Sequence, residues 1–297
     1  AAKIGINISA RTTCIKPAGT TSCILGSSSG IHPHHARRYI RHVQANKLEP
    51  ALEFFMRYNP KAVEESCWSN NKTDMVIKFL CEVPPGSVIK NQVNAITLLE
   101  KVMTTQQNWV EAGTRVDVGL EPWLRHNVSN TITVQPNEWV DVEKYIYDNR
   151  QWFAGISLLP ASGDKDYAQA PFTAVLTPVE IVKTYGDGSL FASGVIEDAV
   201  KAYGGLWEAC ASLLETGAKP STPEQTAWVD RAKRFAGKYF TSPKDMTYCL
   251  KDVYNWKQWI DLSKEYKDVP WEDMYETKDD SKGIEIAACA GGKCELF

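Results

Sequence analysis

The chain has 297 residues, a formal net charge of −3, 43% hydrophobic residues and 23% charged residues. This length suffices for one large domain or two ordinary ones. The acidic balance argues against general nucleic-acid binding, which needs a basic face against the phosphates. The sequence also has no run of about 18 apolar residues that would span a membrane. We therefore expect neither a nucleic acid nor a membrane among the partners.

The N-terminal stretch carries scattered Lys and Arg and no sustained apolar run, so we do not interpret it as a signal peptide. It starts without Met and soon becomes strand-like, as if cut from a longer chain. In a large chain without a secretion signal we expect reduced thiols and a cytoplasmic location. Six of the eight cysteines, all except Cys289 and Cys294, lie among apolar neighbours and are expected to be buried.

The first half of the chain alternates strand-like and helix-like segments. Periodicity and bounding Pro or Gly predict strands at 9–16, 127–136 and 152–163, and helices at 33–45, 92–112 and 138–149. The last of these strands is a continuous apolar run and is expected to be buried on both faces. The order of the elements favours an α/β fold with parallel strand pairing.

The character of the sequence changes after Gly163. An irregular stretch at 164–194 precedes three predicted helices, and an acidic, weakly patterned linker follows them. The helices are expected at 195–216, 223–239 and 250–266, and the linker at 268–285. We divide the chain into an α/β part (1–163), a helical region (164–267) and a linker with tail (268–297).

Small hydroxyl residues crowd the end of the first predicted strand. The strand ends at Pro17 and is followed by Ala18, Gly19, Thr20, Thr21 and Ser22. Glycine allows close approach of a ligand, and a helix N-terminus offers unpaired N–H groups and partial positive charge to a nucleotide phosphate. Plain helix capping by the hydroxyls is the alternative. The segment is not a Walker loop, because no Gly-Lys-Ser/Thr follows.

The last residues carry a second candidate site. Cys289 and Cys294 are separated by Ala-Gly-Gly-Lys and lie close to the C-terminal residue. Such a pair forms and reopens a small disulfide ring, and Lys293 favours the reactive thiolate of Cys294. We expect redox work; an inert tail is the alternative, and zinc would need a second ligand pair.

The histidines of "HPHH" (32–35) raise a metal interpretation as well. Neither an H-E-x-x-H pattern nor a nearby cysteine pair accompanies them. We favour a solvent-facing or phosphate-adjacent helix start, and we expect no metal site in the chain.

Several stretches together resemble a known family. They are "RTTCIKPAGTTS" with "SSGIHPHHARRYIR" after it, then "HNVSNTITV", "FAGISLLP" and the terminal "CAGGKC". Their order and extent are similar to the C-terminal portion of a class II, adenosylcobalamin-dependent ribonucleotide reductase of the monomeric ribonucleoside-triphosphate reductase type.

The resemblance implies a ten-stranded α/β barrel, of which this chain would supply three strands, "TTCIK", "SNTITV" and "GISLLP". It implies that Ala18 to Ser22 hold the phosphates of a ribonucleotide substrate. It also implies that Cys289 and Cys294 re-reduce the active-site disulfide and are themselves reduced by thioredoxin or a similar dithiol donor. The reaction would make 2′-deoxyribonucleotides for DNA replication by a thiyl-radical mechanism.

The sequence departs from the family in one respect: it has no Asn-x-Cys-x-Glu finger loop. Cys67 and Cys81 lie in other contexts. We therefore expect an N-terminal reductase part to supply the radical cysteine and to bind most of the adenosylcobalamin, this chain being a split subunit, an intein-separated part or a fragment that is inactive alone. The alternative is a non-catalytic nucleotide- or anion-binding module with a redox-sensing cysteine pair.

Overall fold

A computed structural model describes residues 1–18, 21–22, 25–161, 167–214 and 220–275. The chain divides into two compact units. Unit 1 comprises Ala1–Arg37 and Glu82–Gly163, and unit 2 comprises Arg38–Cys81 and Asp164–Phe297. No helix within the described ranges is both long and apolar enough to cross a bilayer.

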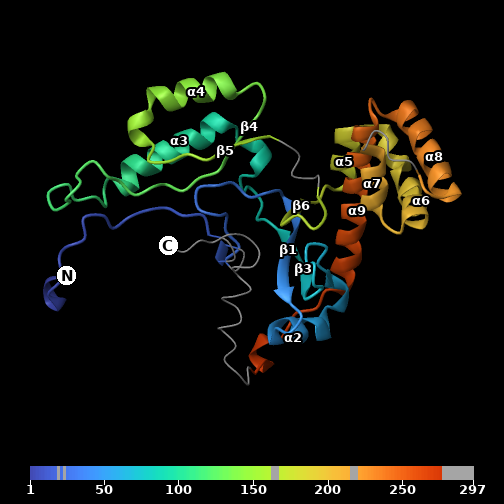
Figure 1. Ribbon diagram of the computed structural model, residues 1–297, viewed down its shortest axis with the longest axis horizontal. Coiled ribbons are helices and arrows are strands. Elements are labelled where there is room, and N and C mark those ends of the chain that lie inside the picture. Colours follow the sequence, from blue (N-terminus) through green and yellow to red (C-terminus); the bar gives the residue numbers. More distant parts are fainter. Residues whose placement is uncertain (19–20, 23–24, 162–166, 215–219, 276–297) are drawn as a thin grey trace. The chain divides into compact units, whose positions relative to one another are not determined.

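Unit 1 packs two helices against a short parallel strand pair (Figure 1). The helices are α3 (Ala95–Thr105), which continues as a π-helical turn (Gln106–Val110), and α4 (Trp139–Asp148); the strands are β4 (Ile132–Val134) and β5 (Leu158–Pro160). Asn94 caps α3 because its side chain accepts a hydrogen bond from the Thr97 backbone N–H at 2.8 Å. The apolar face of α3 buries Leu99 and Val102 against Ile132 and Val134.

Of the three strands predicted for the first half, those at 127–136 and 152–163 form in part, as β4 and β5, whereas residues 9–16 form only isolated bridges. β4 and β5 pair in parallel, with Ile132 opposite Leu158, and Ile15 forms an isolated parallel bridge with Val128. The predicted parallel α/β arrangement is therefore present in this unit. A ten-stranded barrel is not seen in the described residues and stays a prediction.

Unit 2 contains a four-stranded sheet in the order β2-β3-β1-β6. Its strands are β1 (Arg38–Asn46), β2 (Val63–Glu65), β3 (Asp74–Glu82) and β6 (Phe172–Ala174). The pairs β1–β6 and β2–β3 are antiparallel. Helix α2 (Pro50–Tyr58) packs on this sheet through Leu52 and Phe55.

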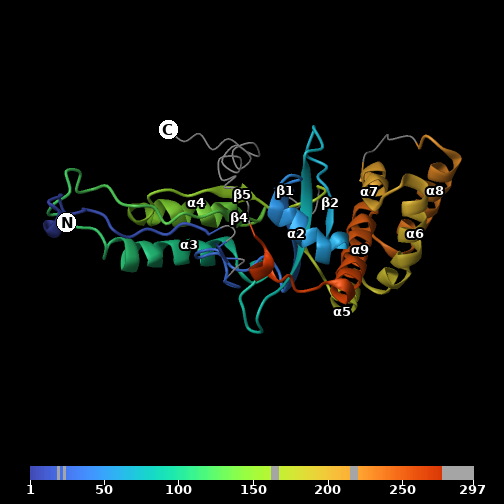
Figure 2. The ribbon, with the colours of Figure 1, turned by 90° about the horizontal axis from the view of Figure 1, so that it is seen from below.

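The rest of unit 2 is a helical bundle (Figure 2). Its helices are α5 (Pro178–Tyr185), α6 (Ala192–Tyr203), α7 (Leu206–Leu214), α8 (Pro223–Tyr239) and α9 (Pro243–Glu265). The bundle core includes Trp228, Met246 and Leu250. Helix α9 also reaches the sheet, where Leu262 joins the cluster around Phe55.

Four sequence predictions about elements are wrong in part. The segment 33–45 is not a helix, because residues 38–46 form β1, whose Ile40 is fully buried and pairs with Thr173 of β6. β5 is not buried on both faces, since Leu159 is 52% exposed. The predicted helix 195–216 is interrupted at Gly204, whose φ of 74° ends α6. The irregular stretch 164–194 contains β6 and α5.

The cysteines of the described residues are free. Cys210 and Cys249 lie in the bundle core, where burial raises the pKa of both thiols to about 12. Cys14 and Cys67 are exposed, contrary to the expectation that they would be buried. Cys14 lies in a stretch without regular structure and Cys67 in a turn, so neither belongs to a packed helix or strand.

Candidate functional site

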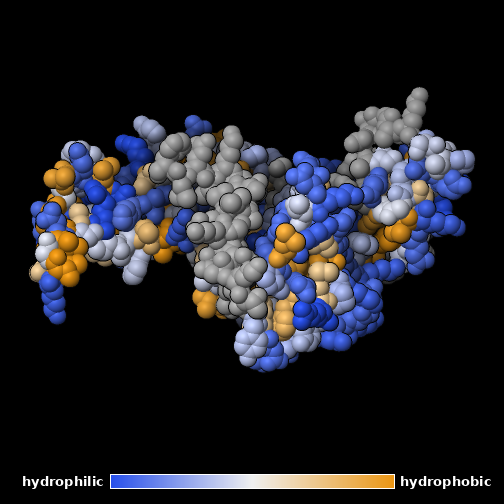
Figure 3. Space-filling model, turned by 60° about the horizontal axis from the view of Figure 1, so that its bottom comes forward, coloured by the Kyte–Doolittle hydropathy of each residue, from blue (hydrophilic) through white to orange (hydrophobic). Residues whose placement is uncertain are grey.

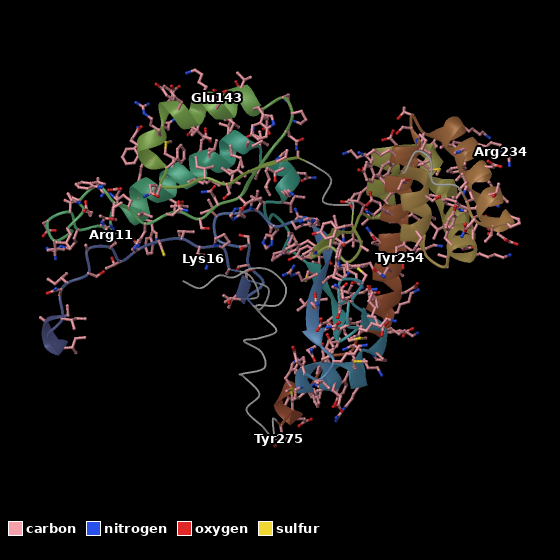
Figure 4. The ribbon with its side chains drawn as sticks, in the orientation of Figure 1. Arg11, Lys16, Glu143, Arg234, Tyr254 and Tyr275 are labelled. Atoms are coloured by element: carbon pink, nitrogen blue, oxygen red, sulfur yellow. The ribbon has the colours of Figure 1, made fainter. Side chains whose placement is uncertain are left out.

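The candidate phosphate loop begins just after the isolated bridge at Ile15. Ile15 bridges Val128, and its carbonyl oxygen accepts a hydrogen bond from the Ser129 N–H at 2.9 Å. Lys16 follows and is exposed; Figure 4 shows it on this stretch of unit 1. Of the predicted site residues, Ala18, Thr21 and Ser22 are described, whereas Gly19 and Thr20 lie outside the described residues.

Two serine hydroxyls converge on the carbonyl oxygen of Ala18. Ser22 Oγ donates to it at 2.9 Å and Ser29 Oγ at 2.6 Å. Because a carbonyl oxygen has two lone pairs, these two bonds use its full capacity. Ser22 is buried, and its hydroxyl donates to the carbonyl four residues earlier, which is not the bond of an N-cap, where the side-chain oxygen accepts.

The predicted helical turn begins within the last two residues of the predicted loop. The Leu25 N–H donates to the Thr21 carbonyl at 3.0 Å, the i to i+4 spacing of an α-turn, and Thr21 itself is exposed. Gly30 packs back onto the loop with a φ of 60°, and a Cβ there would lie 3.4 Å from Pro17 Cα. The second Ser/Gly run therefore supports the first.

His32 connects this support to the strand β4 region. Its Nδ1 lies 3.0 Å from the Ser29 carbonyl oxygen, and its Nε2 accepts from the Thr131 N–H at 3.0 Å. The two contacts fix the neutral tautomer with the proton on Nδ1. The residues around His32 form turns and bends rather than the predicted helix start. No group of three potential metal-ligating side chains occurs within the described ranges.

Asn130 holds the next motif in place. Its buried side-chain Nδ2 donates to the Val128 carbonyl at 2.8 Å and to the Gly155 carbonyl at 3.0 Å, and its Oδ1 accepts from the Ser157 N–H at 3.3 Å. The amide therefore ties "HNVSNTITV" to "FAGISLLP". Sequence reasoning had not singled out Asn130 or this role of His32; the repeated Asn in "NVSN" was the available signal.

The C-terminal pair, Cys289 and Cys294, lies outside the described residues. The tail assignment therefore stays a prediction.

One pocket of unit 2 is too small for a corrinoid cofactor. A pocket of about 140 Å³ lies in unit 2 between the end of α2 and the end of α9, lined in part by Tyr58, Lys61 and Tyr266. Pockets for drug-sized ligands have volumes of about 300–1,000 Å³. Since a corrinoid is larger than such ligands, this pocket does not enclose one.

Comparison with known proteins finds similarity to one kind of enzyme. A scan against protein-family models finds no match. Among curated relatives, an adenosylcobalamin-dependent ribonucleoside-triphosphate reductase of Levilactobacillus brevis is 29% identical over 168 residues, covering 57% of this chain and 21% of the relative. A reductase of the same name from Euglena gracilis is 25% identical over 202 residues, covering 66% of this chain and 25% of the relative.

Among solved structures, a B12-dependent (class II) ribonucleotide reductase aligns with a TM-score of 0.44 and 21% identity, covering 57% of this chain and 22% of that one.

The chain thus resembles part of a class II ribonucleotide reductase, as its motifs predict. The curated relatives that it matches are all named adenosylcobalamin-dependent ribonucleoside-triphosphate reductases. The matches span only 21% to 25% of the length of these relatives.

Proposed function

We propose that this chain is one part of a class II ribonucleotide reductase that converts ribonucleotides, in the first place triphosphates, to 2′-deoxyribonucleotides. One observation carries the proposal: motifs from three separate parts of the sequence are joined in unit 1 by hydrogen bonds. Ser29 joins the loop at Ala18, His32 joins Ser29 to Thr131, and Asn130 joins β4 to Gly155.

In this proposal the segment from Ala18 to Ser22 holds the substrate phosphates. The α-turn that begins at Thr21 supplies the partial positive charge of a helix N-terminus. Lys16 is exposed next to the loop and forms no ion pair within the described part of the chain. A held nucleotide cannot shift during radical chemistry, which limits side reactions.

The dithiol of Cys289 and Cys294 supplies electrons in the same proposal. The Cys294 thiolate attacks one sulfur of the active-site disulfide and forms a mixed disulfide, and the other active-site sulfur leaves as a thiolate. Cys289 then displaces the second active-site sulfur, so that the tail is oxidised by two electrons and the active site is reduced. Thioredoxin or a similar dithiol donor reduces the tail again.

Adenosylcobalamin, when bound to the whole enzyme, supplies radical initiation. We assign most of its binding to the polypeptide that carries the Asn-x-Cys-x-Glu finger loop.

Nucleotide titration tests the loop assignment. We expect the chain to bind a ribonucleoside triphosphate in isothermal titration calorimetry, and Gly19→Val to weaken binding at least tenfold because its side chain blocks close approach of the phosphates. Gly194→Val is the matched control, since a Cβ at Gly194 meets no atom within 4 Å. If the Gly19→Val variant binds the nucleotide as tightly as the wild type does, the segment is a helix cap and not a phosphate site.

A reconstituted turnover assay tests the tail. With the finger-loop polypeptide, adenosylcobalamin and thioredoxin, the wild-type chain should support many turnovers. Cys294→Ser should permit a single reduction, and dithiothreitol should restore further turnovers. The control is Cys67→Ser, which changes an exposed thiol outside the tail. Repeated thioredoxin-driven turnover by the Cys294→Ser variant would refute the assignment. Nucleotide binding without any turnover would favour the non-catalytic module instead.

A further inference from the structure

Two neighbouring segments of unit 1 expose alternating apolar side chains. In the N-terminal segment, Ile4, Ile6 and Ile8 alternate with small or polar residues, and they are 55% to 72% exposed. Such alternation is typical of a strand with one face buried. In the structure no partner covers this face within the described residues, and the segment after the short helical turn Ala2–Ile4 is not part of a strand.

The second segment repeats the pattern. Val116, Val118 and Leu120 alternate with Asp117, Gly119 and Glu121, and the three apolar side chains are 40% to 98% exposed. Trp123 follows and is 71% exposed. We call these seven apolar residues of the two segments the apolar surface: Ile4, Ile6, Ile8, Val116, Val118, Leu120 and Trp123.

Backbone and side-chain bonds join the second segment to Ala10 and Arg11, which follow the N-terminal segment along the chain. Arg11 forms an antiparallel bridge with Thr114, and the Arg115 N–H donates to the Ala10 carbonyl at 2.7 Å. The Arg11 guanidinium also donates to the backbone carbonyls of Glu121 and Leu124, at 2.7 and 2.9 Å. Figure 3 shows hydrophobic side chains gathered at the end of the unit that carries the N-terminus. The two sets of exposed side chains therefore lie on stretches of chain that are joined at Ala10 and Arg11.

The charges in this region are largely compensated. Arg115 pairs with Asp117, and that guanidinium lowers the pKa of the Asp117 carboxyl. Exposed apolar side chains that cluster, in contrast to single ones, mark sites of contact with another protein. A partner for this region is accordingly an apolar polypeptide surface rather than a charged one.

We propose that the apolar surface docks onto the part of the reductase that this chain does not contain. This inference rests on the proposed function. The matches cover only 21% to 25% of the relatives' length, so a reductase built with this chain needs further polypeptide. The strand-like alternation in both segments fits an occupant that adds extended, apolar backbone to them.

The test measures association with the reductase polypeptide that carries the Asn-x-Cys-x-Glu finger loop, taken from the same source as this chain. We expect Ile6→Lys and Val118→Lys each to weaken the complex at least tenfold in calorimetry, and their combination to abolish it. The matched control is Val140→Lys on α4 of the same unit, where the side chain is 77% exposed, and it should bind as the wild type does. Unfolding midpoints should stay unchanged, because all three side chains are exposed.

The outcomes separate this inference from the proposed function. Tight binding by both lysine variants would overturn the apolar surface as the docking site while leaving the reductase assignment intact. A wild-type chain that neither binds the finger-loop polypeptide nor supports deoxyribonucleotide formation would overturn the proposed function itself. Self-association that the lysine substitutions abolish, without binding to the finger-loop polypeptide, would show a contact between copies of this chain and would overturn the inference.

Discussion

Replacing Asn130 with Asp gives a sharp test of the hydrogen-bond network in unit 1. The substitution keeps the size of the side chain and changes the buried NH2 group into an oxygen. That group donates to two carbonyls, at 2.8 and 3.0 Å. In the variant an oxygen faces these two oxygens, and both carbonyls lose their donor. The accepted bond from the Ser157 N–H, at 3.3 Å, remains possible.

The cost has two parts. Two lost hydrogen bonds contribute about 2 kcal/mol. Burial beside carbonyl oxygens raises the pKa of such a carboxyl by about two units, which adds about 3 kcal/mol at pH 7. Since the pKa in the folded state lies above that in the unfolded state, the variant loses stability as the pH rises from about 4 to about 6. Relative to wild type we expect destabilisation of about 5 kcal/mol at pH 7 and about 3 kcal/mol at pH 4.5.

Denaturant unfolding followed by circular dichroism at both pH values measures this difference. Asn108→Asp is the matched control, because Asn108 is exposed and donates to the Thr104 carbonyl at 2.9 Å within one helix; it should cost far less at either pH. If the Asn130→Asp variant is unfolded at pH 7, it should refold at pH 4.5. Destabilisation that is equal at both pH values, or as small as that of the control, would refute the network.

The remaining predictions concern pH and packing. Burial lowers the pKa of His42 below its ordinary value of 6.5, and the positive charge of Lys78 lowers this pKa further. The hydrogen bond to the Ala170 carbonyl acts in the opposite direction and raises the pKa. As the pH falls, the unfolded chain therefore takes up the proton before the folded chain does, so stability should decrease below about pH 6.5. In the His42→Asn variant the unfolding midpoint should depend less on pH in this range. A Cβ at Gly113 would lie 1.9 Å from a threonine hydroxyl, so Gly113→Ala should destabilise the chain by about 1–3 kcal/mol. A Cβ at Gly237 of α8 would lie in open space, so Gly237→Ala should stabilise the chain by up to about 1 kcal/mol. Thermal unfolding of the two variants should show opposite changes in stability.

Local signals predicted some of the helices well. Helix α8 occupies Pro223–Tyr239 as predicted, because Thr222 caps it, Pro223 opens it and its apolar spacing is regular. Helix α3 was found from its period alone. These features act within a few residues, so the sequence contains them directly.

The elements that the sequence did not predict depend on pairing between residues that are far apart in the chain. Residues 38–46 have apolar side chains at helical spacing, yet they form β1 because Ile40 pairs with Thr173, more than a hundred positions away. β-branched and aromatic side chains such as Tyr39 and Val43 suit a half-buried sheet, and that preference prevailed over the period.

The candidate site shows the same division between local and distant information. The sequence predicted the hydroxyl-rich loop and the turn that begins at Thr21. It did not predict that Ser29 donates to Ala18, or that His32 reaches Thr131, because these contacts depend on how the strands are arranged.

The arrangement around Ala18 explains why two hydroxyl-rich runs stand so close together in the chain. A carbonyl oxygen beside a phosphate would repel it, because both carry negative charge. Ser22 and Ser29 occupy both lone pairs of this oxygen, so its charge is compensated within the protein. The second run is thus needed for support of the loop, and His32 in turn fixes Ser29 through its carbonyl. In the proposed phosphate interpretation this compensation removes the repulsion, but a carbonyl oxygen withdrawn from water needs a donor in a capping loop as well, so the nucleotide titration of the Gly19→Val variant decides between the two.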